Sequence, residues 1–243
     1  MKTSIITSLW AVAAIHLCQC AQPSQAVFPT EFSNQNGNTG DIILADPDEI
    51  QQLFRPSAFA GQWQTPVEIT GIAFRVADGA PAYSATVPSL QINLSTSART
   101  PETMARSYLA NKGADETTVY LHNNIFFSSP DTPPINPFGI QITFDKPFIY
   151  DPTKGSLLMD FISGGTSSYS GSALISSQLY HSLSSSPGAA VSPNNPLGAP
   201  NTVLPYALIT EFSWTPIPEP STIGLLVTGA AALLLTFGRS KNR

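Results

Sequence analysis

Charged residues are scarce in this sequence. They make up 11% of the 243 residues, against roughly 25% in an ordinary soluble domain. This scarcity excludes a long charged helical bundle, a coiled coil and a polyelectrolyte tail. The formal net charge is −5, and basic residues cluster only in the last five positions. We therefore exclude nucleic acid as a partner, because phosphate binding needs clustered Lys and Arg.

Cysteine is also nearly absent. The chain has two, Cys18 and Cys20, and both fall in a predicted secretory leader. The exported chain would then contain none, so a domain of this size must depend on its hydrophobic core instead of disulfides. Lipid attachment at Cys18 is not expected, because bulky His16 and Leu17 precede it where small residues are usual.

The predicted leader spans 1–26. A lysine at the second position gives the positive start, and 5–17 is an apolar stretch too short to cross a bilayer comfortably. Small residues fit cleavage after Ala26. Cleavage after Cys20 or Ala21 is one alternative, and a retained signal-anchor helix is another.

A second apolar run, 223–238, lies near the C-terminus. It contains no charged residue, and Arg239, Lys241 and Arg243 follow at once. Counted from 221 to 238, about 18 residues of helix would span roughly 27 Å, which is marginal against a hydrocarbon core of about 30 Å. A buried core helix is the alternative. We expect a transmembrane helix with a cytoplasmic basic tail at 239–243, because Lys and Arg favour the cytoplasmic side.

A proline-rich linker, 215–222, directly precedes this run. It contains Pro218-Glu219-Pro220-Ser221-Thr222, which we call the sorting motif. Proline fixes φ and holds the chain extended with few internal hydrogen bonds. A processing enzyme can bind such an exposed peptide at the membrane face. From physics alone, a stiff spacer is the alternative.

The sorting motif, the apolar helix and the basic tail together resemble the PEP-CTERM sorting signal of exported proteins in biofilm-forming Gram-negative bacteria. The resemblance covers 218–243. It implies a membrane-embedded exosortase that recognises the motif, transient anchoring in the inner membrane, removal of the helix, and delivery to the cell surface or the exopolysaccharide matrix. The basic tail is more dilute than the usual arginine cluster.

The region 27–214 is predicted to be one exported domain rich in strands. Apolar residues alternate with period two, which is typical of half-buried strands, in 71–76, 90–94, 138–144 and 206–214. The continuous apolar run 157–162 predicts a strand covered on both faces. Proline and glycine turns separate these runs, which favours an antiparallel β-sandwich or jelly roll.

Two short helices are predicted within this domain. Thr100-Pro101-Glu102 has the residues of a helix start, and Gly113 can end that helix. The segment 46–54 begins with a similar pattern, although a strand is an alternative there. Segments 51–75, 113–120 and 148–155 resemble a β-rich ectodomain that recurs upstream of such sorting tails, and the resemblance implies no established activity.

No pattern in the sequence indicates catalysis. The acidic residues of 46–49 could bind Ca²⁺ through oxygen, but they match a helix cap better. His122 and His181 lack the spacing of zinc ligands, and 164–171 contains no nucleophile elbow. A pair of facing carboxylates, as in glycosidases, cannot be identified from sequence. We expect no cofactor, no metal and no enzymatic activity.

Carbohydrate binding is the alternative function. Aromatic side chains on a β-sandwich can form a sugar platform, and Trp63 lies between two glutamines, so it is the candidate for an exposed ligand-binding residue. Trp214 shares a face with apolar residues and is expected in the core. The sequence thus predicts an exported surface or matrix protein, structural or adhesive in an exopolysaccharide layer. A carbohydrate-binding module and a polysaccharide-degrading enzyme are its alternatives.

Overall fold

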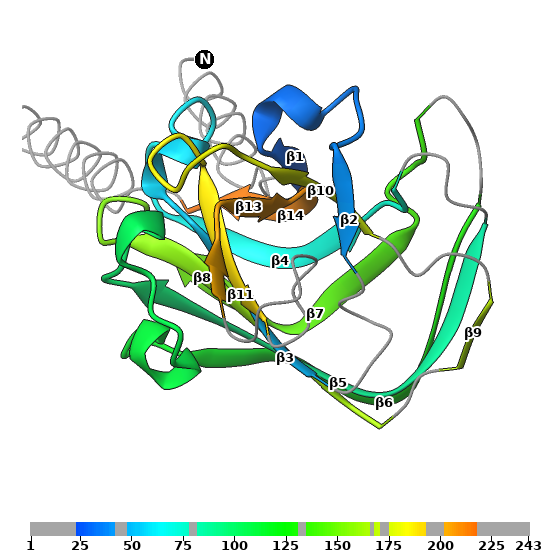
Figure 1. The fold of residues 1–243 in the computed structure, drawn as a ribbon. Coiled ribbons are helices and arrows are strands. Elements are labelled where there is room, and N and C mark those ends of the chain that lie inside the picture. The colour runs from blue at the N-terminus through cyan, green and yellow to red at the C-terminus, as the bar shows by residue number, and fades with distance from the viewer. Residues whose placement is uncertain are drawn as a thin grey trace, which may run out of the picture.

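The computed structural model describes residues 23–41, 48–77, 82–130, 135–165, 168–170, 175–192 and 202–217. Within these ranges the protein is mainly β, and all strand pairs are antiparallel. Two sheets face each other in a sandwich-like arrangement, with a small third sheet at one side (Figure 1). The predicted fold class is therefore confirmed at the level of an antiparallel, sandwich-like β domain.

The larger sheet is built from strands distant in sequence. Their order is β12 (Thr202–Leu204), β11 (Gly188–Ser192), β3 (Asp48–Phe54), β8 (Ser156–Gly164), β5 (Tyr83–Ser97) and β6 (Thr117–Ser129), with β9 (Ser168–Ser170) also paired to β5. The interior strand β8 is buried on both faces over most of its length, as the continuous apolar run predicts. Within the predicted segment 46–54, the described residues 48–54 form strand β3 of the same sheet, so the strand alternative is correct there.

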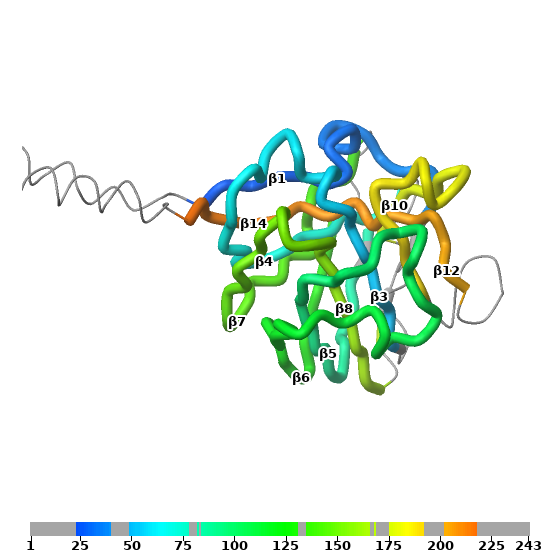
Figure 2. The backbone as a smooth tube through the Cα atoms, turned by 90° about the vertical axis from the view of Figure 1, so that its left-hand side faces the viewer, coloured from blue at the N-terminus to red at the C-terminus, as the bar shows by residue number. Residues whose placement is uncertain are grey.

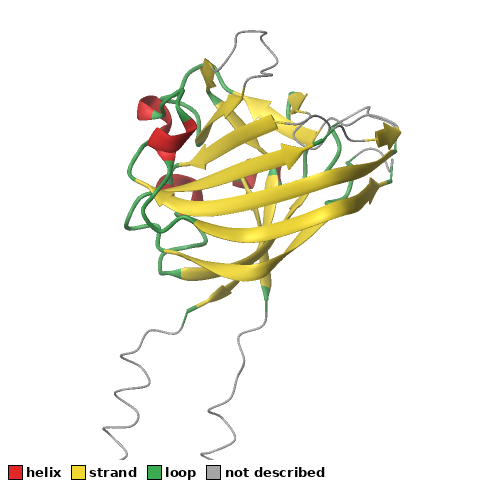
Figure 3. Cartoon of the chain, turned by 90° about the horizontal axis from the view of Figure 1, so that it is seen from below, coloured by secondary structure: helices red, strands yellow, loops and turns green. Residues whose placement is uncertain are grey.

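The other two sheets are smaller. One has the order β1 (Ser24–Phe28), β14 (Thr210–Pro216), β4 (Val67–Phe74) and β7 (Ile140–Tyr150), and the third has β13 (Tyr206–Leu208), β10 (Ile175–Leu179) and β2 (Thr39–Asp41). The predicted alternation is confirmed in β7, where Ile140, Ile142 and Phe144 are buried and the residues between them are exposed. Figure 3 shows how strands dominate the described chain.

The larger of the two hydrophobic clusters among the described residues fills the space between the two facing sheets. The larger sheet contributes Ile92, Leu94 and Phe161, and the smaller one contributes Ile72 and Phe212. Buried apolar area stabilises a fold by roughly 25 cal/mol per Å². A core that spans both sheets therefore supplies the cohesion expected of a domain without disulfides.

Short 3₁₀ turns replace the predicted helix at 100–113. They are η3 (Pro101–Thr103) and η4 (Tyr108–Asn111). The predicted helix start at Thr100 is confirmed, because the backbone N–H of Thr100 donates to Thr103 Oγ1 at 2.9 Å, as in a helix cap. The helix stops because Met104 leaves the helical region to pack on the outer face of the larger sheet. The Asn111 side chain then hydrogen-bonds both the N–H and the C=O of Ala105, which replaces helical hydrogen bonds.

The first and last described strands are neighbours. In the β1–β14 pair, Ser24 lies opposite Trp214 and Phe28 opposite Thr210. The start of β1 and the end of β14 therefore lie at the same end of the smaller sheet (Figure 2). The backbone N–H of Ile217 still bonds Pro66 O at 3.3 Å, so ordered contacts continue to the residue before Pro218.

Candidate functional site

The structure describes only some of the residues predicted to carry function. Pro218, Glu219, Pro220, Ser221 and Thr222 lie outside the described residues, as do Arg239, Lys241 and Arg243 and the predicted helix 223–238. No helix within the described ranges is long and apolar enough to cross a membrane.

Trp63 is buried, and the prediction that it is exposed is wrong. Its relative exposure is 2%. The turn after η2 (Pro56–Phe59) is the physical reason: the N–H of Trp63 donates to Phe59 O at 2.8 Å. The Trp63 ring stacks on the Phe59 ring with centroids 4.5 Å apart, and the edges of Phe28 and Phe212 surround it. The two flanking glutamines are exposed, as their polarity suggests. Their polarity does not predict the burial of the tryptophan between them.

A lysine surrounded by three carboxylates lies on the outer face of the larger sheet. Lys112 Nζ is 2.7 Å from Asp160 Oδ2, 3.0 Å from Glu116 Oε1 and 3.7 Å from Glu49 Oε1. Asp160 belongs to the buried strand β8, and its side chain is 2% exposed. Asn93 Nδ2 also donates to Asp160 Oδ2 at 3.3 Å. Lys112 thus compensates a buried charge and ties the η3–η4 segment to the sheet.

The pKa values of this cluster follow from burial and neighbouring charge. Burial alone would lower the pKa of Lys112, but hydrogen bonds to Asp160 and Glu116 outweigh it and raise the pKa above its usual value. Burial and the Asp160 charge raise the pKa of Glu49, although Lys112 opposes the shift. Glu49, predicted as a cap or Ca²⁺ ligand, is therefore a member of an ionic cluster. No three metal-ligating side chains converge in the described part of the chain.

His122 forms a side-chain hydrogen bond that sequence reasoning missed. Its Nε2 lies 2.8 Å from Asp145 Oδ1, and both side chains are about half exposed. The hydrogen bond from His122 lowers the pKa of Asp145. Asp145 Oδ2 also accepts from the N–H of Leu121 at 3.3 Å. The pair therefore joins edge strand β6 to edge strand β7, where the two facing sheets meet.

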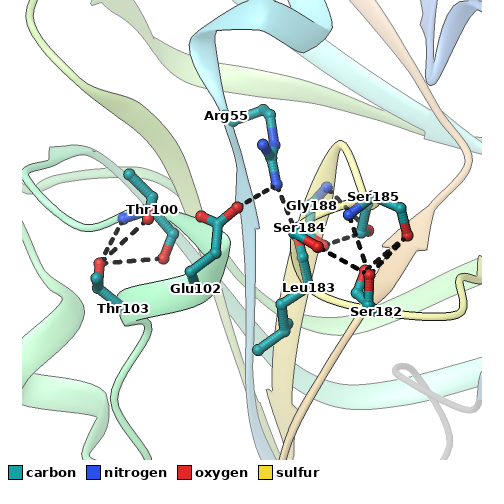
Figure 4. A network of polar contacts seen from close by, with 10 residues as sticks. Arg55, Thr100, Glu102, Thr103, Ser182, Leu183, Ser184, Ser185 and Gly188 are labelled. Carbon is teal, nitrogen blue, oxygen red and sulfur yellow. Dashed lines mark hydrogen bonds and ion pairs between the residues drawn. The ribbon is translucent and has the colours of Figure 1, made fainter.

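A polar hollow surrounds Arg55, directly after β3. A hollow of about 360 Å³, which we call the Arg55 hollow, is lined by Glu31, Arg55, Ser57, Tyr180, Ser185 and Pro187, among others. Arg55 Nη2 donates to Leu183 O at 2.7 Å and to Glu102 Oε1 at 3.0 Å. Figure 4 shows Arg55 between Glu102 on one side and the serine-rich turn, residues 182–186, on the other.

The walls of the Arg55 hollow come from three segments held together by hydrogen bonds. The serine-rich turn closes through Ser186 N–H to Ser182 O at 3.1 Å. Tyr180 Oη donates to Glu31 Oε1 at 3.0 Å. Burial, followed by the charge of Glu31, raises the pKa of Tyr180, so its hydroxyl stays protonated and able to donate. The hollow thus combines hydroxyl, carboxylate and guanidinium groups in a site suited to binding polar ligands.

A second, smaller hollow of about 240 Å³ lies on the outer face of the smaller sheet. Gln25, Thr70, Gln141, Thr143 and Glu211 contribute to its lining. Burial raises the pKa of Glu211, although neighbouring Arg75 opposes the shift. This hollow is a depression in one sheet, whereas separate turns build the Arg55 hollow.

No family model and no curated protein matches the sequence. The function of the Arg55 hollow is therefore inferred from the chemistry of its own residues. Sequence reasoning missed the Arg55 hollow because its segments, 29–31, 55–58 and 180–187, are distant along the chain. The serine-rich composition of the last segment was the only local signal.

Replacing Lys112 tests the ionic cluster. Lys112→Met should lower the free energy of unfolding by about 3 kcal/mol, because it leaves buried Asp160 without its counter-charge. Urea unfolding at neutral pH measures the change. Lys154→Met is the matched control: Lys154 is 73% exposed, so its loss should change stability by less than about 0.5 kcal/mol. Equal stability of the two variants would contradict this role of Lys112.

Two glutamate variants should respond to pH with opposite signs. Glu49 has a raised pKa in the folded protein, so its ionisation opposes folding. The protein therefore loses stability as pH rises from the usual pKa of a glutamate to the raised pKa of Glu49. Glu102 has a lowered pKa, mainly through Thr100, so its contribution is present above its usual pKa and is lost as pH falls.

Urea midpoints of Glu49→Gln and Glu102→Gln, each compared with the parent chain at pH 4 and pH 7, measure these contributions. On going from pH 4 to pH 7, Glu49→Gln should gain stability relative to the parent, and Glu102→Gln should lose it. Shifts of the same sign in the two variants would show that the assignment of the pKa directions is wrong.

Proposed function

We propose that this chain is an exported surface or extracellular-matrix protein, sorted by a PEP-CTERM signal and non-enzymatic, with a structural or adhesive role in an exopolysaccharide layer. The sorting motif, the apolar segment 223–238 and the basic residues Arg239, Lys241 and Arg243 support the sorting step. In this account the helix spans the inner membrane until an exosortase-type membrane protease acts at the motif.

The β1–β14 pairing carries the proposal. Ser24 lies opposite Trp214, so the segments before β1 and after β14 begin at the same end of the body. If the chain has a leader at its N-terminus and an anchor at its C-terminus, both can therefore enter the same membrane at this end of the domain. Cleavage beyond Ile217 leaves β14 intact between β1 and β4, so release needs no unfolding of the domain.

The same pairing supports a revised end of the leader. β1 has five residues, and cleavage after Ala26 would remove three of them. Ala26 is 4% exposed and belongs to the core. We therefore place leader cleavage after Cys20 or Ala21, which keeps the whole strand. We also propose that the strands of the exported domain are connected as in a jelly roll, as the strand pattern of the sequence predicts.

The double variant Pro218→Ala/Pro220→Ala tests the sorting step. Expressed in a Gram-negative host that carries an exosortase, it should accumulate uncleaved in the inner-membrane fraction, because the recognised extended peptide is lost. Fractionation and immunoblotting with an antibody to the domain measure the distribution.

Pro133→Ala/Pro134→Ala is the matched control, because it removes two prolines from the body and none from the motif. It should be processed and exported like the parent chain. If the motif variant is also processed and surface-displayed at parental levels, the motif is only a spacer and the proposal fails.

A further inference from the structure

The Arg55 hollow has the size of a small-ligand site. Its volume is about 360 Å³, at the lower end of the range of about 300–1,000 Å³ typical of such pockets. Glu31, Ser57 and Ser185 line it and are exposed, so a ligand can reach them from solvent. Pro187, which is half-buried, adds apolar surface to the same lining.

The hydrogen-bonding groups of the hollow match a polyhydroxylated ligand. Serine and tyrosine hydroxyls both donate and accept, and a carboxylate only accepts. Arg55 Nε is buried without a partner among the described residues, although a buried unsatisfied donor costs about 1–3 kcal/mol. Because Nε is shielded from solvent and Nη2 is bound to Leu183 and Glu102, the ligand contacts fall to the exposed hydroxyl and carboxylate groups of the hollow.

The charges of the hollow disfavour an anion. Arg55 is paired with Glu102 at 3.0 Å, and Glu31 adds a second negative charge at the other wall. The protein as a whole carries −5. An acidic sugar would find no unpaired positive charge in the hollow, and the carboxylate of Glu31 would repel it. A neutral sugar is not repelled.

We infer that the Arg55 hollow binds a neutral saccharide unit, with Glu31, Ser57 and Tyr180 contacting its hydroxyl groups and Pro187 contacting its C–H surface. This deepens the proposed function by naming the chemical class of the matrix component. Saccharide binding in solution needs neither export nor processing, so the inference and the sorting step can fail separately.

The test uses the full-length chain, purified in detergent, with maltotetraose and cellotetraose as neutral probes and tetragalacturonic acid as the acidic one. Saturation-transfer difference NMR should show contact with a neutral probe at about 1 mM. Ser57→Trp, which fills the hollow from an exposed position, should weaken binding at least about tenfold. Ser128→Trp is the matched control, because Ser128 is exposed on β6, away from the lining, and should bind as the parent does.

A second variant, Tyr180→Phe, keeps the aromatic ring and removes the hydroxyl. It should also weaken saccharide binding. It carries the test if Ser57→Trp does not fold. The inference is overturned if no neutral probe binds the parent chain, if the acidic probe binds more tightly, or if folded hollow variants bind as the parent does.

Discussion

The pairing of β1 with β14 is the constraint on which the rest of this structure depends. It places the first described strand beside the last, with Ser24 opposite Trp214. Because β14 also pairs with β4, the strand that leads to the sorting motif is an interior strand of its sheet. The last described strand is therefore held by a neighbour on each side.

Charge is used sparingly and in defined places. Lys112 compensates Asp160 beneath the η3–η4 segment, and Arg55 fastens the serine-rich turn to η3 through Leu183 and Glu102. A few ionic contacts thus fix turns on a body whose cohesion comes from apolar packing. This division is consistent with a domain that lacks disulfides and has only 11% charged residues.

The sequence predicted the strands well because alternation reflects burial on one face. The predicted strand runs in β5, β7 and β8 appear, whereas the run 206–214 is divided at Ile209 into β13 and β14, which belong to different sheets. It failed where a tertiary contact overrides a local signal. Thr100-Pro101-Glu102 starts a helix that Met104 and Asn111 end after one turn, and Trp63 is drawn into the core by Phe59 despite its polar neighbours.

The candidate site could not be predicted from the sequence, because its residues meet only in three dimensions. Glu31 and Tyr180 are 149 positions apart, and the carboxylates around Lys112 come from two strands and a turn. No local spacing encodes such contacts. The predicted terminal signals are the opposite case, since each prediction rests on a local pattern of residues and on no contact within the fold.

The central claim is that both ends are removed around an intact sandwich-like body. Intact-mass and terminal-peptide mass spectrometry of the protein recovered from the surface of its native host tests this most directly. The account predicts an N-terminus before Ser24 and a C-terminus between Ile217 and Ile223. A mature chain that keeps 223–243, or that begins at Val27, would contradict it.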